Sequence, residues 1–314
     1  MPLYTQVPID DPKLHNQTKL TSITKKEYED YFLPHPSNMF YDVIRVILFI
    51  VTLGPIRMLI SLLCIVALYV TMIILNRFFK HHFKSMNDYK RFSQKALYPI
   101  VRLLLFSIGI IHIKRKGEIK STTRTIIINH LTLFDIMVAV TMFDSSYLAM
   151  ASLKHIGFMK EANDIFNMVF VDRSKPGQGT TETIRKIQGD PSTVPIVIFP
   201  EGKVTNGDIL LGFRTGGFIS DTPLQAITLR YNHWFCPKGL STIAWVHPSD
   251  LFYIWQVYTI PFMTLEINIL PQVCFEDKTP EDKAREVELM MANSLGCLAV
   301  KQTNKEYFKE HISS

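Results

Sequence analysis

The sequence contains few cysteines, a modest share of charged residues and no internal repeat. Its four cysteines are widely spaced without a CxxC pair, which argues against a disulfide framework or a zinc site and fits a reducing compartment. Charged residues make up 20% of the chain, below the roughly 25% of typical soluble proteins. The N-terminus lacks the basic start and apolar core of a secretory signal. The composition as a whole excludes a disordered chain, a collagen-like chain and a polytopic transporter.

The residues that are present describe a chain that is part globular and part membrane-seeking. Its 314 residues suffice for one large domain or two ordinary ones. Hydrophobic residues make up 47% of the chain and the mean hydropathy is positive, at +0.12. The 34 basic residues exceed the 28 acidic ones, so the net charge is +6. Such a balance suits nucleic acid, anionic lipid or a phosphorylated ligand.

Two apolar runs follow a polar N-terminal arm, which we expect to be flexible or peripheral. The first run is Val46–Ile56 and contains the helix breaker Gly54-Pro55; the second, Met58–Leu75, has 18 residues. Only the second approaches the length of a bilayer-spanning helix. The runs predict either a single span with an interfacial first helix or a re-entrant helical hairpin. A buried core helix is the alternative, but a long run without amphipathic period is unusual inside a soluble domain.

A basic stretch comes next. It sets six basic residues against one acid, with Phe and Tyr interleaved: Arg77, Lys80, Lys84, Lys90, Arg91 and Lys95 against Asp88. Basic residues beside an apolar run favour the cytoplasmic side and suit an interfacial helix on anionic lipid. Nucleic-acid binding and a plain solvated helix face are the alternatives. A further apolar piece, Ile100–Ile111, is too short to span and predicts a buried or half-embedded helix.

From about residue 117 the pattern alternates between strands and helices. Strands are expected at 112–116, 125–129, 168–172, 195–199, 224–230 and 265–270, and helices at 133–143 and 180–188. Thr279 and Pro280 mark the start of a last helix, as N-cap and first helical residue. This order predicts an α/β fold with a mixed, largely parallel sheet covered by helices, preceded by the membrane-embedded helical segment.

Three of the expected strands end in residues that can perform chemistry. The first is followed by NHLTLFD, residues 129–135, where His130 can donate one ring N–H to Asp135 and use the other nitrogen as a general base. Thr132 is expected to cap the following helix, with Asp135 in its first turn. The alternative is that Thr132 and Asp135 form only a capping box and that His130 is a loop residue.

The second and third strand ends carry charges suited to an anion. FPEGK spans Phe199, Pro200, Glu201, Gly202 and Lys203, and combines a tight turn with an acceptor and a cation. VFVDRSK carries Arg173, a fork-shaped phosphate ligand, and Lys175. A strand-turn-loop without function is the alternative for FPEGK, and a surface ion pair of Asp172 for VFVDRSK.

Together, these motifs resemble the glycerolipid acyltransferase superfamily, which contains the 1-acylglycerol-3-phosphate acyltransferases. NHLTLFD is similar to the family's NHx4D motif, VFVDR to its arginine-bearing block and FPEGK to its FPEGT block. FPEGKVTNGDILLGFRTGGF followed by LQAITLRY is closer to the lysophosphatidylcholine and lysophosphatidylethanolamine acyltransferase branch. The similarity covers about residues 45 to 300.

The resemblance implies acyl transfer from acyl-CoA to the free hydroxyl of a lysophospholipid, in phospholipid synthesis or remodelling. The acceptor is lysophosphatidylcholine, lysophosphatidylethanolamine or lysophosphatidic acid. His130 is then the general base and Asp135 orients it, so Asp135→Asn is expected to lower the rate strongly through loss of tautomer control. Acceptor phosphate is expected at Arg173, Lys175, Glu201, Gly202 and Lys203, with support from Asn129, Phe199 and Pro200. No metal or other cofactor is expected.

The composition along the chain and the resemblance together predict the domain organisation and the partners. We expect a polar arm at 1–42, a membrane anchor with the basic interfacial helix at 43–98, the catalytic domain at 99–302 and a tail at 303–314. The partners are acyl-CoA, the lysophospholipid and an anionic bilayer surface, without nucleic acid. The expected place is the endoplasmic reticulum membrane, with the catalytic domain facing the cytosol.

Three positions depart from the family pattern: Lys203 stands for a threonine, Asn167 for a glycine and Ala226 for a proline. Two other functions remain alternatives. One is a non-catalytic membrane scaffold that keeps the fold, which the presence of both His130 and Asp135 disfavours. The other is transfer to glycerol 3-phosphate.

Overall fold

The computed structural model describes residues 4–6, 10–35, 38–171, 180–234 and 243–305. Its centre is an eight-stranded sheet in which β1 pairs with β8 beside the order β2-β9-β8-β3-β6-β4-β5. Five of the six pairings along that order are parallel, and only β8 and β9 run antiparallel. The strands are β1 (Tyr4–Gln6), β2 (Ile110–Lys116), β3 (Thr125–Ile128), β4 (Ser146–Met150), β5 (Met168–Val171), β6 (Ile196–Ile198), β8 (Leu224–Trp234) and β9 (Met263–Ile269). The predicted α/β fold is therefore confirmed.

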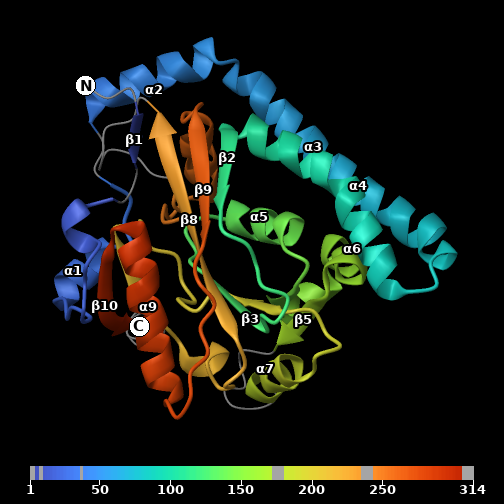
Figure 1. The fold of residues 1–314 in the computed structure, drawn as a ribbon. Coiled ribbons are helices and arrows are strands. Elements are labelled where there is room, and N and C mark those ends of the chain that lie inside the picture. The colour runs from blue at the N-terminus through green and yellow to red at the C-terminus, as the bar shows by residue number, and fades with distance from the viewer. Residues whose placement is uncertain (1–3, 7–9, 36–37, 172–179, 235–242, 306–314) are drawn as a thin grey trace.

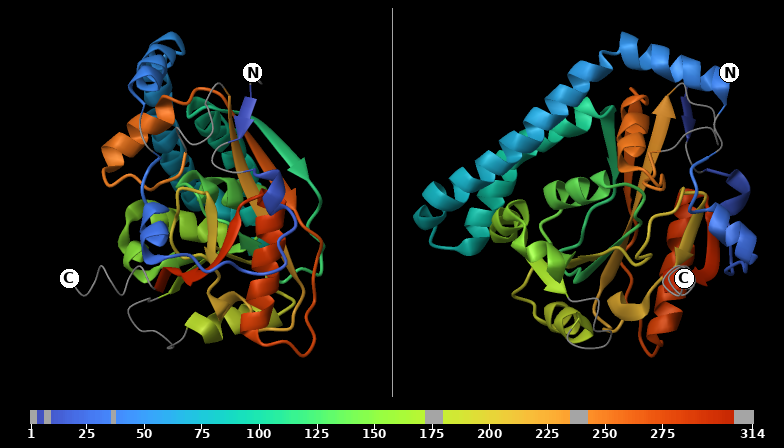
Figure 2. Two further views of the ribbon diagram at one scale, coloured as in Figure 1. Left: turned by 90° about the vertical axis from the view of Figure 1, so that its left-hand side faces the viewer. Right: turned by 180° about the vertical axis from the view of Figure 1, so that it is seen from behind.

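Helices cover both faces of this sheet, as Figures 1 and 2 show. They are α1 (Lys25–Asp30), α2 (Met39–Val51), α3 (Gly54–Ile74), α4 (Met86–Ser107), α5 (Phe134–Met142), α6 (Gly157–Phe166), α7 (Thr180–Gly189), α8 (Asp250–Tyr258) and α9 (Pro280–Leu295). Helix α9 begins as predicted, with the Thr279 side chain accepting a hydrogen bond from the Asp282 N–H. A second, parallel two-stranded sheet joins β7 (Ile209–Gly212) to β10 (Leu298–Thr303).

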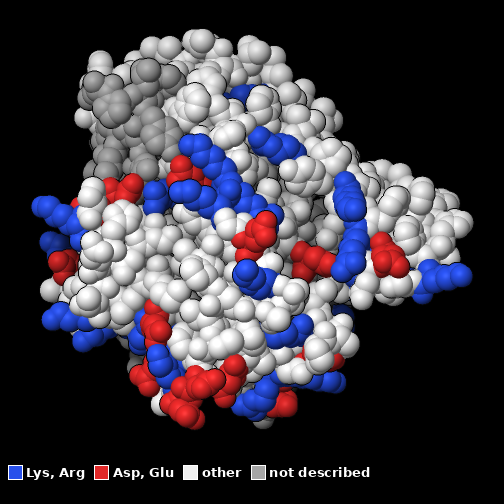
Figure 3. Space-filling model, viewed as in Figure 1, with Lys and Arg blue, Asp and Glu red and all other residues white. Residues whose placement is uncertain are grey.

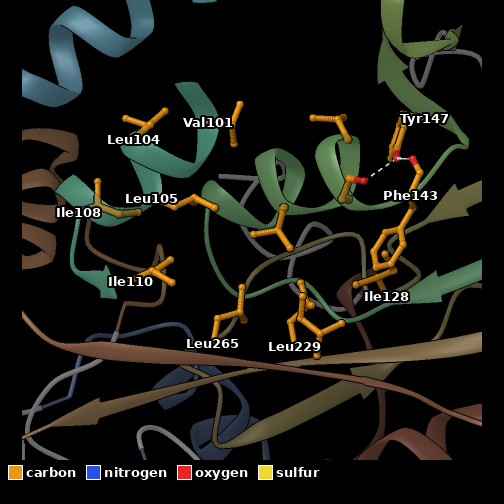
Figure 4. Packing of buried hydrophobic residues seen from close by; sticks show 14 of the residues in the cluster. Val101, Leu104, Leu105, Ile108, Ile110, Ile128, Phe143, Tyr147, Leu229 and Leu265 are labelled. Carbon is orange, nitrogen blue, oxygen red and sulfur yellow. Dashed lines mark hydrogen bonds between the residues drawn. The ribbon is translucent and has the colours of Figure 1, made fainter. Parts of the chain in front are cut away.

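Strand β3 is buried on both faces, which explains its unbroken run of apolar residues. Ile126 and Ile128 belong to the core beneath α4 and α5, whereas Ile127 belongs to the core beneath α7 and α9. Successive side chains of a strand point to opposite faces, so three adjacent isoleucines serve two cores. Figure 4 shows how the first core gathers Leu105 of α4, Ile128 of β3 and Leu265 of β9.

The two apolar runs form separate helices, and Leu53 between them has a left-handed backbone, with φ of 56°. Helices α2 and α3 meet at a bend and do not fold back on each other, and α3 then runs beside α4 along one side of the molecule (Figures 1 and 2). Helical turns continue from Gly54 to His82, and this is the one described helix long and apolar enough to cross a membrane. The surface over α2 and α3 carries few charges (Figure 3).

The basic stretch and the next apolar piece differ from their prediction as separate segments. Both contribute to α4, which runs through Pro99 without ending, so the predicted boundary between residues 98 and 99 falls inside a helix. Basic side chains of this region bond to the globular part: Lys80 to Asp164 at 2.8 Å, Arg91 to Asp144 at 3.0 Å, and Lys90 to Asn167. These side chains attach α4 and the helical turns after α3 to the rest of the domain.

The polar N-terminal residues pack on the domain, whereas the sequence suggested a flexible or peripheral arm. Tyr28 and Phe32 are buried with Leu211 of β7 and Val300 of β10. The Tyr28 hydroxyl donates to the Thr303 carbonyl at 2.9 Å. Two aromatic side chains within a polar stretch are the sequence signal for this packing.

Candidate active site

The candidate site lies where β3 and β6 end. These strands are parallel neighbours that pair Thr125 with Ile196 and Ile127 with Ile198, so the residues after them emerge at the same edge of the sheet. In α/β proteins this edge, at the carboxyl ends of the strands, is where ligands bind. His130 follows β3 and Glu201 follows β6. The topology therefore brings two of the predicted motifs together.

His130 and Asp135 are in contact. The Nδ1 atom of His130 lies 3.0 Å from Oδ2 of Asp135, and the carboxyl group is completely buried. When Nδ1 carries the proton and donates it to the carboxylate, Nε2 is left as the acceptor, which is the state a general base requires. Nε2 makes no hydrogen bond to the described residues.

Three further donors hold the Asp135 carboxyl. Oδ2 accepts hydrogen bonds from the N–H groups of Leu131 at 2.6 Å and Thr132 at 2.8 Å, and Oδ1 accepts one from the Tyr231 hydroxyl at 2.5 Å. Burial raises the pKa of Tyr231 well above its usual range, and the nearby Asp135 carboxyl adds to this. Tyr231 therefore stays protonated and remains a donor.

Thr132 has a different role from the one its sequence position predicts. Helix α5 starts one residue later than a Thr132 cap would require, and its N-cap, Leu133, forms no side-chain hydrogen bond. The Thr132 hydroxyl instead lies 2.7 Å from the hydroxyl of Tyr253 on α8. This contact fastens the His130 loop to a helix more than a hundred residues away in sequence.

Asn129 and Phe199 support His130 from two sides. The Asn129 side chain donates to the Leu229 carbonyl at 3.1 Å and accepts from the Leu229 N–H at 2.8 Å, which extends the pairing of β3 with β8. The Phe199 ring lies 4.7 Å from the His130 ring, centroid to centroid. Both motif residues thus contribute to placing the histidine.

Glu201 also holds this loop. Its side chain is buried; Oε1 accepts from the His130 N–H at 3.0 Å and Oε2 from the Leu211 N–H at 3.3 Å. Burial raises the pKa of Glu201 to about 8, although both hydrogen bonds act in the opposite direction. With both oxygens occupied by backbone groups, this geometry differs from the predicted role in acceptor binding and fits a positioning role.

The rest of the FPEGK turn is shaped by its backbone. The Pro200 carbonyl accepts from the Arg214 N–H at 3.0 Å. Gly202 has φ of +67°, and a Cβ there would lie 2.6 Å from the side-chain nitrogen of Asn304, so glycine is required. Lys203 follows, and its ammonium lies 5.4 Å from the centroid of the Phe32 ring.

Arg173 and Lys175 lie outside the described residues. Besides Lys203, Asn167 and Ala226 depart from the family pattern, and both have structural explanations. Asn167 ends α6 in the left-handed region, with φ of 50° and ψ of 50°, a conformation that asparagine tolerates and glycine favours. Ala226 is buried in β8 opposite Ile127, where a small residue fits between neighbouring strands.

Sequence reasoning missed Tyr231 and Tyr253 as site residues. Tyr231 lies within the LQAITLRY segment, but nothing local distinguishes it from a core tyrosine of a buried strand. Tyr253 is one of several aromatics on α8. Their importance comes from hydrogen bonds to residues 96 and 121 positions away, which no local pattern encodes.

Residues 119–229, which include all three motifs, match the family model for acyltransferases. Over 211 residues the chain is 32% identical to lysophosphatidylcholine acyltransferase 1 of Rattus norvegicus, covering 64% of this chain and 38% of that protein. It is 29% identical to the lysophospholipid acyltransferase LPEAT1 of Arabidopsis thaliana, covering 51% of this chain and 42% of that protein. The resemblance predicted from the motifs is confirmed.

The fold also resembles a solved structure, the 1-acyl-sn-glycerophosphate (LPA) acyltransferase PlsC of Thermotoga maritima. The two match with a TM-score of 0.54 and 14% identity, over 76% of this chain and 95% of that one. The chain spans about two fifths of the length of the curated relatives it matches.

Proposed function

We propose that this chain, whose residues 119–229 match the acyltransferase family, transfers an acyl group from acyl-CoA to the free hydroxyl of a lysophospholipid. The observation that carries the proposal is the His130–Asp135 pair at the carboxyl edge of the sheet, with Nδ1 and Oδ2 at 3.0 Å. The lysophospholipid acyltransferases among the relatives support this class of acceptor.

The reaction needs one base and good positioning, because a thioester is already activated. Nε2 of His130 takes the proton of the acceptor hydroxyl while the hydroxyl oxygen bonds to the thioester carbonyl carbon. The tetrahedral intermediate then collapses, the carbon–sulfur bond breaks and the CoA thiolate takes the proton from His130. Asp135 stabilises the imidazolium that forms in between. No metal or redox cofactor takes part.

A membrane surface is the natural place for this reaction, because acyl-CoA and lysophospholipid both collect there. Large apolar side chains stay exposed on α2 and α3, and on α8, where Leu251 is 80% exposed. The Phe49 and Trp255 rings lie 4.7 Å apart and join α2 to α8. We propose that this apolar surface rests in the bilayer of the endoplasmic reticulum with the domain in the cytosol.

Replacing His130 tests the function. Purified His130→Ala protein in vesicles should lose acyl transfer from radiolabelled acyl-CoA to every lysophospholipid of a panel, while still floating with the vesicles. The control is His112→Ala, which removes an exposed histidine of β2 and should retain activity. Full activity of His130→Ala contradicts the mechanism, and an inactive wild-type chain that still binds vesicles indicates a scaffold.

A further inference from the structure

A cavity of about 480 Å³ lies between the N-terminal residues, the turn after β6 and the segment before α8. Its volume is in the range of small-ligand pockets, which is roughly 300–1,000 Å³. It combines two charged side chains of opposite sign with aromatic rings, and its lining includes Glu29, Phe32, Lys203, Trp245, His247 and Pro248. The motif-based reaction does not use most of these residues.

The two charges and the aromatic rings come from distant parts of the chain. Lys203 places its ammonium 5.4 Å from the Phe32 ring centroid. Glu29 lies one helical turn before Phe32, whose N–H donates to the Glu29 carbonyl at 3.0 Å. Trp245 is 39% exposed. A carboxylate beside aromatic rings recognises an alkylammonium, and a lysine ammonium recognises a phosphate.

The walls of this cavity are tied to the loop that carries His130. The backbone N–H of Trp245 donates to the Leu131 carbonyl at 2.9 Å. Lys203 follows Glu201 by two residues, and Glu201 accepts the His130 N–H. Hydrogen bonds and a short stretch of backbone therefore join the cavity walls to the loop that carries the base.

The cavity also adjoins an apolar surface. Pro248 lines it, and Leu251 stands exposed three residues further along, in the first turn of α8. A polar, charged cavity next to an exposed apolar helix suits an amphipathic molecule, with its head in the cavity and its chain in the bilayer.

We infer that this cavity binds the zwitterionic head group of the acceptor, phosphocholine or phosphoethanolamine. Lys203 holds the phosphate, and Glu29 with the exposed ring of Trp245 holds the ammonium. This assignment rests on the proposed function and narrows it to zwitterionic lysophospholipids. It also explains Lys203, which stands where the family pattern has an uncharged threonine.

Binding of a soluble head group tests the assignment without turnover. Glycerophosphocholine, which has no acyl chain, should change the tryptophan fluorescence of the wild-type protein in a saturable way, and Trp245→Phe should remove that change. Glycerol 3-phosphate, which lacks the ammonium, is the comparison ligand. Glu29→Gln should weaken glycerophosphocholine binding about fivefold and leave glycerol 3-phosphate binding equal or tighter. Lys203→Thr should weaken both ligands.

The matched control is Asp30→Asn, which removes the same charge from the next residue of α1, outside the cavity lining. Melting curves check that each variant is folded. Absence of glycerophosphocholine binding to the wild-type protein overturns the assignment. Two other results also overturn it: Glu29→Gln weakens the binding of both ligands equally, or Lys203→Thr binds both ligands as the wild-type protein does. Head-group binding with the expected variant pattern, in a protein that transfers no acyl group, supports the cavity assignment and contradicts the proposed function.

Discussion

Replacing Asp135 with asparagine removes a negative charge and keeps the shape of the side chain. The structure determines how the amide must turn. Oδ2 faces the N–H groups of Leu131 and Thr132, which can only donate, so the asparagine oxygen has to occupy that side. The amide nitrogen then faces the Tyr231 hydroxyl, which can rotate and accept. In this orientation the oxygen still accepts from Nδ1 of His130, so the catalytic tautomer survives.

The expected loss of activity is therefore that of the charge alone. A hydrogen bond to a charged group contributes about 1.5–3 kcal/mol, so kcat should fall about tenfold to somewhat over a hundredfold. When the corresponding change in serine proteases also selects the wrong histidine tautomer, the loss is about 10⁴-fold. The sequence alone suggested the larger effect, and the two backbone donors predict the smaller one.

Single-turnover acyl transfer in vesicles measures the loss directly, because product release does not enter. Asp144→Asn is the matched control, since Asp144 bonds to Arg91 away from His130. If kcat of a folded Asp135→Asn protein fell 10⁴-fold or more, the inferred orientation of the asparagine amide would be wrong. Adding Tyr231→Phe to Asp135→Asn removes the acceptor of the amide nitrogen and should lower kcat further.

Three other substitutions test the hydrogen bonds to Asp135, the buried carboxyl of Glu201 and the exposed side chains of α8. Tyr231→Phe alone should lower kcat by about tenfold with little change in KM, since three donors still hold Asp135; an unchanged kcat contradicts a positioning role. Because the folded-state pKa of Glu201 is raised to about 8 from 4.5, the stability it contributes is complete below pH 4.5 and is lost as pH rises to about 8. In urea unfolding, the free energy of unfolding of Glu201→Gln should fall less steeply over that pH window than that of the wild-type protein. An identical fall in both proteins would contradict the raised pKa of the buried carboxyl. Replacing Leu251 and Phe252 by glutamate should reduce vesicle flotation while leaving the melting temperature within a few degrees, because both side chains are exposed; undiminished flotation would exclude α8 from the membrane surface.

Local patterns were sufficient for most strands of the central sheet and for helices α5, α7 and α9. Strand β3 and the start of α9 at Thr279 and Pro280 follow from residue types and spacing within a few positions. Strands β1, β4, β7 and β10 and helices α1, α6 and α8 were not predicted. Helix α4 was split where its composition changes from basic to apolar, but it continues through that boundary and through Pro99, a residue that disfavours helix interiors. Packing of α4 against α3, α5 and α6 overrides that local preference.

The candidate site divides in the same way. Residue order was enough to predict that a histidine and an aspartate five residues apart follow a buried strand, and that a Pro-Glu-Gly turn follows another. The folded chain was needed to find that Glu201 holds the His130 backbone, that Tyr231 is a further donor to Asp135, and that Glu29 shares a cavity with Lys203. The physical reason is the range of the interactions: helix and strand periods are encoded in adjacent residues, whereas a hydrogen bond between distant strands depends on which strands become neighbours in the sheet.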